Sequence, residues 1–164
     1  MADELITEIS CGPSAIFNSP TTFAIAHCIS ADLAMGAGFA KELMTRYDSS
    51  LIRNTLRMQN LSVGGVGFVQ CGDRVILNLV SKLMYYHKPT LSDIVRCIRN
   101  MHTMCEERSI RSIAMPRIGC GLDRQCWKNI RAALVDEFNR GRGTESASDD
   151  GRTITIHVYD IHSH

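Results

Sequence analysis

Apolar positions along the chain fall into six short runs that are typical of β-strands. Phe23–Ile29 is almost entirely apolar, which predicts a strand covered on both faces of a sheet. Thr153–Tyr159 alternates instead, with Ile154, Ile156 and Val158 on one face, and this period indicates a half-buried strand. The six predicted strands are Leu5–Ile9, Phe23–Ile29, Val66–Gln70, Val75–Ser81, Ile110–Met115 and Thr153–Tyr159.

Four helices are predicted between these strands from apolar residues at helical spacing. The first two are Ala37–Tyr47 and Ser50–Met58, and Thr90–Asp93 resembles a capping box that starts the third. Apolar stripes mark the last two helices: Ile94, Ile98, Met101 and Cys105, then Trp127, Ile130, Leu134 and Phe138. Strands that alternate with helices, with one hairpin turn at Gly72-Asp73, predict a three-layer α/β/α domain with a mixed sheet.

Length and charge narrow the class of protein. With 164 residues, 45% of them apolar, the chain is expected to form one domain, residues 1–164, with a core over about 5–161. A net charge of +1 gives no broad basic field for DNA or RNA, so an anion would be bound locally. The start, MADELITEIS, predicts neither a secretory signal nor a membrane span. Seven cysteines without a C-x-x-C pair favour reduced thiols, hence a cytoplasmic or nuclear location.

Two glycine-rich junctions have the same order of strand, loop and helix. Gly36-Ala37-Gly38 precedes the first predicted helix, and Pro116–Asp123, PRIGCGLD, precedes the last one. Free amides at a helix N-terminus favour phosphate, and glycine lets the backbone approach a ligand closely. Each loop alone is equally well read as an ordinary turn. Together they favour a diphosphate ligand at the carboxyl ends of the strands.

The segments AHCIS, MGAG, HKPT and MPRIGCGLD, in this order and spacing, resemble the macrodomains that bind ADP-ribose. Within that family the chain is most similar to the terminal ADP-ribose protein glycohydrolases, also described as O-acyl-ADP-ribose deacylases. The resemblance covers about Leu5 to Ile161 and implies a single macrodomain with a mixed six-stranded sheet between helices.

The resemblance also implies the site residues. Lys82 matches the subgroup's nucleophile and Asp123 its acid–base partner. In place of the family's Gly-Asp that holds adenine, the chain has Ser14-Ala15, so adenine recognition is expected to be weaker or made by the backbone. The expected ligand-binding residues are Ile16, Ser30, Met35, Gly36, Ala37, Gly38, Ser81, Arg117, Ile118, Gly119, Cys120, Gly121, Leu122 and Ile161.

Simpler roles compete for several of these residues when the sequence is taken alone. Asp123 precedes a predicted helix, and a role as its N-cap is favoured over catalysis. Lys82 can be a solvated strand end, and Lys88 is as plausible a cation by position. His27 lies in an apolar run, where a hydrogen-bonded structural histidine is favoured over a catalytic one. Cys120 has no evident base beside it that would make it a nucleophile.

The activity implied by the resemblance is hydrolysis. The enzyme would remove ADP-ribose from acidic protein side chains and deacylate O-acetyl-ADP-ribose, using neither a metal nor a cofactor. The expected partners are ADP-ribose and mono-ADP-ribosylated proteins, with no membrane, and the chain is expected to be a monomer. Two alternatives remain: an enzyme that strips ADP-ribose from nucleic-acid bases, and a reader that binds ADP-ribose without turnover.

Overall fold

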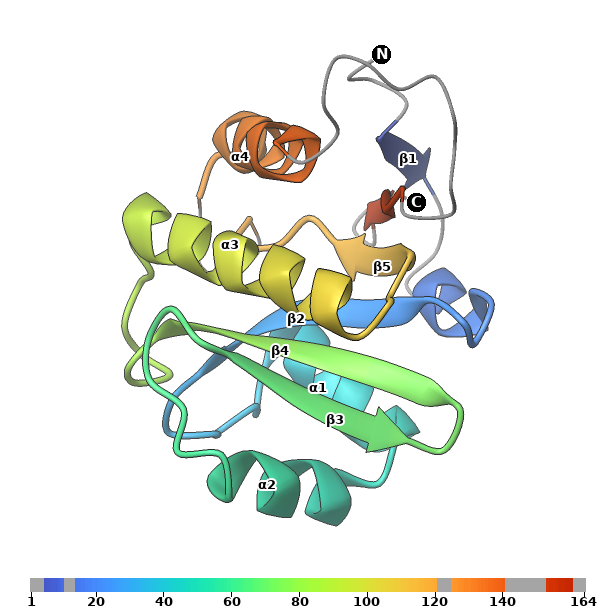
Figure 1. Ribbon diagram of the computed structural model, residues 1–164. Helices are drawn as coiled ribbons and strands as arrows, with labels where there is room; N and C mark the ends of the chain where they lie inside the picture. Colours follow the sequence, from blue (N-terminus) through green and yellow to red (C-terminus); the bar gives the residue numbers. More distant parts are fainter. Residues whose placement is uncertain (1–4, 11–13, 121–124, 141–152, 161–164) are drawn as a thin grey trace.

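A computed structural model describes residues 5–10, 14–120, 125–140 and 153–160 of the protein. The described residues form six strands, four α-helices and one short 3₁₀-helix (Figure 1). The strands are β1 (Ile6–Ser10), β2 (Ala24–Ser30), β3 (Val66–Cys71), β4 (Arg74–Lys82), β5 (Ser112–Pro116) and β6 (Thr155–Asp160). The helices are η2 (Ala15–Asn18), α1 (Gly38–Arg46), α2 (Ser49–Arg57), α3 (Leu91–Glu107) and α4 (Trp127–Asn139).

The strands form one mixed sheet in the order β1-β6-β5-β2-β4-β3. Neighbouring strands run parallel except for β3, which pairs antiparallel with β4 through the hairpin predicted at Gly72. Gly72 has a φ of +57°, a conformation that glycine adopts without strain. Because β5, β2 and β4 are parallel neighbours, their carboxyl ends meet at one edge of the sheet.

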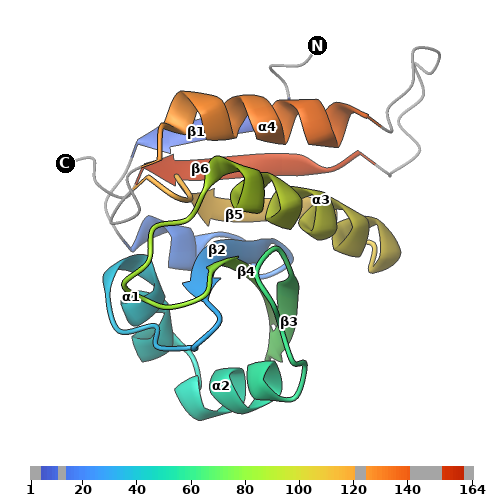
Figure 2. The same cartoon turned by 90° about the vertical axis from the view of Figure 1, so that its left-hand side faces the viewer.

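Two buried clusters of apolar side chains lie on opposite faces of this sheet. Helices α3 and α4 cover one face, and α1 and α2 cover the other (Figures 1 and 2). Strand β2 supplies Ala24 and Ala26 to the first cluster and Ile25 and Ile29 to the second, which explains its continuous apolar run. The predicted three-layer α/β/α arrangement with a mixed six-stranded sheet is confirmed.

The boundary between α3 and β5 differs from the prediction for a local reason. Ser109 has a φ of +57°, and the amide of Ile110 donates to the carbonyl of Cys105 across 2.9 Å. The amide of Arg108 likewise bonds the carbonyl of Met104. Helix α3 thus ends at Glu107 with Arg108 as its C-cap, the left-handed Ser109 turns the chain, and β5 begins only at Ser112.

The structure also contains a short helix that the sequence pattern did not predict. The short helix η2 has no counterpart among the predicted elements, and Ser14 is its N-cap residue. The N-cap residue of α4 is Cys126, whose side chain makes no capping hydrogen bond, and Asp123 lies outside the described residues. Among the described residues, no helix has the length and apolar character needed to cross a bilayer.

Candidate active site

A cleft of about 830 Å³ opens at the carboxyl ends of β2, β4 and β5. In parallel α/β sheets this edge is where ligands bind. Its described lining comes from the end of β2, the β2–α1 loop with the start of α1, the end of β4 with the segment after it, and the end of β5. The lining ranges are 27–30, 34–40, 82, 85–88 and 116–119.

The first glycine junction forms one wall of the cleft at the start of α1. Helix α1 begins at Gly38, whose φ is +60°, and its N-cap residue Ala37 contributes no side-chain hydrogen bond. The first amides of α1 therefore face the cleft without a side-chain cap, and the helix dipole favours an anion there. Arg53 of α2 holds this loop from behind, because its guanidinium donates to the carbonyls of Leu33 and Ala34 at 3.2 and 2.8 Å.

The second glycine junction, after β5, is held tightly at Gly119. This residue has a φ of +77°, and an added Cβ would lie 2.9 Å from Ile130 and 3.0 Å from Ile94. Its carbonyl accepts from the amide of Gln125 at 2.6 Å, and the Gln125 side chain donates to the carbonyl of Pro89 at 2.8 Å. Gly119 is therefore needed for both the conformation and the close packing of this loop against α3 and α4.

Lys82 ends β4 on the cleft wall, where its register partner is Ser30 of β2. Beside it lies Asp32, which sequence reasoning missed. The carboxylate of Asp32 accepts hydrogen bonds from the Ser30 hydroxyl at 2.5 Å and from the amides of Ala34 and Tyr85 at 3.1 and 3.0 Å. Partial desolvation opposes ionisation, but these hydrogen bonds and the charge of Lys82 keep the pKa of Asp32 below its usual value. The signal in the sequence was an acid two residues after a buried strand.

The guanidinium of Arg117 is held at the far side of the second loop. It contacts the carboxylates of Glu8 and Asp160 at 3.4 and 3.9 Å, and it lies 5.8 Å from the centre of the Trp127 ring. Glu8 also accepts from the Trp127 indole at 3.2 Å and from Arg131 at 2.9 Å. One carboxylate of β1 thus ties together the end of β5 and the first turns of α4.

His27 lies buried at the base of the cleft, facing α1. Its Nε2 lies 2.7 Å from Oδ1 of Asn78, whose amide nitrogen donates to the carbonyls of Gly67 and Ile76. Because that amide nitrogen faces carbonyls, Oδ1 is the acceptor, and Nε2 of His27 carries the proton. Burial lowers the pKa of His27 to about 4, so the ring is neutral. The structural role favoured from the sequence agrees with this geometry, although the buried Nδ1 makes no hydrogen bond with the described residues.

The cleft brings together nine of the site residues expected from the resemblance: Ser30, Met35, Gly36, Ala37, Gly38, Lys82, Arg117, Ile118 and Gly119. Three others are not among the described lining residues. Ile16 is buried in the core on the α1 side, the hydroxyl of Ser81 is 3.5 Å from the carbonyl of Ile29, and Cys120 is half-buried. Burial raises the pKa of the Cys120 thiol to about 11, which opposes a nucleophilic thiolate. Gly121, Leu122, Asp123 and Ile161 lie outside the described residues.

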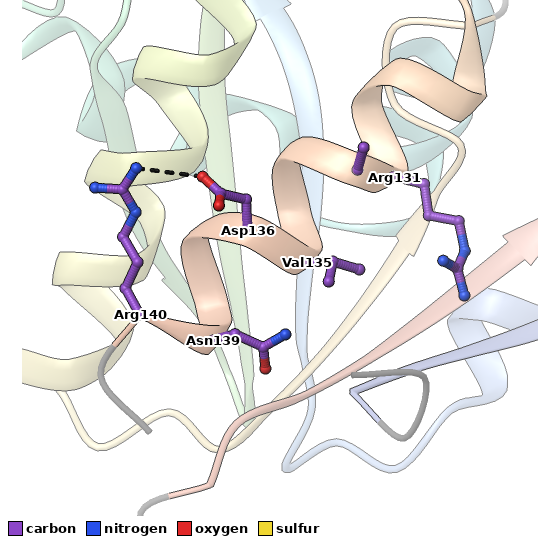
Figure 3. A pocket seen from close by; sticks show the side chains of 6 residues that line it. Arg131, Val135, Asp136, Asn139 and Arg140 are labelled. Carbon is purple, nitrogen blue, oxygen red and sulfur yellow. Dashed lines mark hydrogen bonds and ion pairs between the residues drawn. The ribbon is translucent and has the colours of Figure 1, made fainter. Parts of the chain in front are cut away.

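A second, shallow depression of about 530 Å³ follows the exposed face of α4 alone (Figure 3). Arg140 and Asp136 form an ion pair along it at 3.2 Å, and none of the predicted site residues lines it. Within the described ranges, no three histidine, cysteine, aspartate or glutamate side chains converge in a way that could hold a metal ion. The cleft at the sheet edge is therefore the candidate active site.

Comparisons with known proteins agree on one family. A family model described as the Macro domain matches residues 26–133. ADP-ribose glycohydrolase OARD1 of Homo sapiens is 35% identical over 123 residues, which cover 75% of this chain and 79% of the relative. The macrodomain of Mycobacterium tuberculosis DarG matches with a TM-score of 0.76 at 19% identity, covering 94% of this chain and 97% of that one. Thermosipho africanus DarTG, solved in complex with ADP-ribose, matches with a TM-score of 0.69 at 15% identity, covering 88% of this chain and 39% of that one.

Proposed function

The chain belongs to the macrodomain family, and from this premise we propose that it is a hydrolase that releases ADP-ribose from glutamate and aspartate side chains of proteins and deacylates O-acetyl-ADP-ribose. The observation that carries the proposal is the cleft that places Lys82 beside two glycine junctions at one sheet edge. The name of the human relative, an ADP-ribose glycohydrolase, supports the same class of reaction.

The two junctions suit the diphosphate of ADP-ribose. The uncapped amides at the start of α1 lie on one wall, and the Arg117–Gly119 backbone lies on the other. Such amides bind phosphate oxygens by hydrogen bonding and by the helix dipole. The neutral ring of His27 adds no cation, which leaves Arg117, Lys82 and Lys88 as the charged side chains of the lining. With the diphosphate between the junctions, the distal ribose would lie toward Lys82.

The proposed reaction uses Lys82 as an amine nucleophile. Its Nζ forms a bond to the anomeric carbon of the distal ribose, and the bond from that carbon to the substrate carboxylate breaks with its electron pair. Loss of a proton from nitrogen and opening of the ribose ring give an imine between Lys82 and ADP-ribose. Water then adds to the imine carbon, the C–N bond breaks, and ADP-ribose leaves with the lysine amine restored. Asp123, which has this role by the resemblance alone, would transfer the protons.

Parallel incubations with four substrates test the proposal. Glutamate-linked ADP-ribose on a protein, O-acetyl-ADP-ribose, serine-linked ADP-ribose and ADP-ribose linked to a DNA base are compared for release of free ADP-ribose. We expect release from the glutamate ester and from O-acetyl-ADP-ribose, and none from the serine linkage, whose alkoxide is a poorer leaving group than a carboxylate. Release from DNA alone would favour a nucleobase glycohydrolase. Binding of ADP-ribose without release from any substrate would favour a reader.

A further inference from the structure

Three of the five large apolar side chains that are exposed in the described part of the chain lie in one short stretch after Lys82. They are Leu83, Tyr85 and Tyr86, with exposed fractions of 57%, 63% and 66%. We call these three residues the 83–86 face. Clustered exposed apolar side chains, unlike single ones, mark places where another molecule binds. Tyr85 and Tyr86 also line the candidate active-site cleft, so this face continues the cleft outward.

The 83–86 face is held in place by hydrogen bonds to its neighbours. The amide of Tyr85 donates to the Asp32 carboxylate at 3.0 Å, and the amide of Asp32 donates to the carbonyl of Leu83 at 3.2 Å. The two tyrosine rings meet edge to face, with centroids 5.3 Å apart, and the Tyr86 ring contacts His87 at 4.8 Å. The amide of Asp32, in the loop that precedes α1, thus joins that loop to this segment between β4 and α3, which Figure 2 shows as the yellow-green trace leading into α3. A surface ordered in advance loses little conformational entropy when a partner binds.

The position of this face relative to Lys82 indicates what would contact it. In the proposed reaction the group released from ADP-ribose is attached at the carbon that Lys82 attacks. In the proposed binding mode the diphosphate lies between the two glycine junctions, which both line the cleft. Beyond Lys82, the cleft wall consists of Tyr85, Tyr86, His87 and Lys88. The rest of the substrate, on the leaving-group side, therefore has to pass over the 83–86 face.

We propose that the 83–86 face is a docking surface for the polypeptide that carries the ADP-ribosylated acidic side chain; this inference rests on the proposed function. Tyrosine is enriched at protein interfaces, where its ring buries area and its hydroxyl stays hydrated. A nucleic-acid surface would need a track of cations. Of the three cations in the described lining, Lys82 lies near Asp32 and Arg117 contacts Glu8 and Asp160. Lys88 alone forms no track of cations, and the whole chain carries a net charge of +1. The polypeptide is therefore the partner that this chemistry favours.

The consequence is a preference between the two proposed substrates of this site. O-acetyl-ADP-ribose has a leaving group too small to reach the 83–86 face, whereas an ADP-ribosylated protein covers it. The test measures kcat/KM for both substrates with wild type and with Tyr85→Ser/Tyr86→Ser. We expect the ratio of protein to O-acetyl substrate to fall about 5- to 50-fold in the double variant, the range for truncating interface aromatics. Met58→Ser is the matched control, because Met58 is 84% exposed but follows α2, and its ratio should equal that of wild type.

A binding measurement separates failure of this inference from failure of the proposed function. In a Lys82→Ala background, which prevents turnover by the proposed route, the affinity for an ADP-ribosylglutamate peptide is compared with that for free ADP-ribose. We expect the peptide to add affinity and the two tyrosine substitutions to remove the gain. An unchanged kcat/KM ratio, or a peptide that adds no affinity, would overturn the docking surface even if hydrolysis is confirmed. A selective loss with an ADP-ribosylated oligonucleotide, but not with the peptide, would also overturn it.

Discussion

Lys82 and Asp32 lie on adjacent segments at the sheet edge, and their proximity bears on how a lysine could serve as a nucleophile. The carboxylate of Asp32 is held by three hydrogen-bond donors, so it stays ionised and fixed beside the amine. A fixed anion orients the ammonium group and limits its movement within the cleft. In the proposed reaction the amine has to be free of its proton when it attacks the anomeric carbon.

Covalent catalysis by Lys82 predicts an adduct that can be trapped. If an imine forms, cyanoborohydride added during turnover should reduce it and leave ADP-ribose bound to the protein, and peptide mapping should place it on Lys82. Lys82→Arg should lose both the adduct and ester cleavage, because guanidinium keeps the charge but cannot act as an amine nucleophile. Lys88→Arg is the matched control and should still trap at Lys82. An active Lys82→Arg protein would leave water activated by Asp123 as the better mechanism.

Neutral, buried His27 predicts a pH dependence of stability. Its pKa is lowered from 6.5 to about 4 in the folded protein, so between these values the unfolded chain binds the proton more tightly. The neutral state of His27 therefore contributes to the free energy of unfolding above pH 6.5. This contribution is lost as the pH falls toward 4, by up to about 3 kcal/mol. Denaturant unfolding of wild type and His27→Gln over this range checks it. As the pH falls, wild type should lose more unfolding free energy than His27→Gln. A difference between the two proteins that is independent of pH would contradict the prediction.

At the scale of elements, the sequence predicted the six strands and four α-helices in their order, and the bounds that it gave for the strands and the first two helices lie within two residues of those observed. The periodicities of β2, α3 and α4 are strong because their buried faces are apolar. The differences from the prediction arose where long-range contacts or unusual local conformations set an element boundary or a side-chain partner. The start of β5 depends on the left-handed conformation of Ser109, which the residue type alone does not predict. The hydrogen bonds of Glu8 to α4 and of Asp32 to the segment after β4 join positions far apart in sequence, so pattern reasoning could not find them.

Arg74, at the start of β4, stabilises a different part of the chain, the segment between η2 and β2. We therefore expect its substitution to lower the free energy of unfolding strongly. Its buried guanidinium donates to four backbone carbonyls and two hydroxyls around the segment between η2 and β2: Phe17, Ser19, Pro20, Phe23 and Tyr47. Arg74→Met would leave these buried acceptors unsatisfied, and we expect a loss of about 3 kcal/mol in unfolding free energy. Arg140→Met, at an exposed ion pair on α4, should change it by less than about 0.5 kcal/mol. Equal losses measured by urea unfolding would refute the role of Arg74.

At the scale of the whole molecule, the site follows from the topology of the sheet. Three parallel strands from distant parts of the chain end side by side, and each is followed by a segment that lines the cleft. The sequence predicted this edge as the ligand site because two of those segments contain glycine. Tyr86 and His87, at the HKPT end of the segment after β4, were expected to shape the cleft, but Tyr85 was not, since exposed side chains follow no period. The net charge of +1 leaves anion binding to the local amides rather than to a general field.

A ligand that fills this edge should stabilise the entire domain, because binding only the folded state shifts the unfolding equilibrium. ADP-ribose at 100 times its dissociation constant should add about 2.7 kcal/mol, which corresponds to a rise of about 5–10 °C in the melting temperature for a domain of this size. ADP lacks the distal ribose that would lie toward Lys82, so it should give a smaller rise.

Gly36→Val should reduce the rise in melting temperature caused by ADP-ribose, because it places a branched side chain on the cleft wall. The unliganded fold should tolerate it, since an added Cβ would meet only the carbonyl of Ala34, at 3.8 Å. Thermal unfolding followed by circular dichroism provides the measurement, and a well-folded protein that shows no shift at millimolar ADP-ribose would contradict ADP-ribose as the ligand of this cleft.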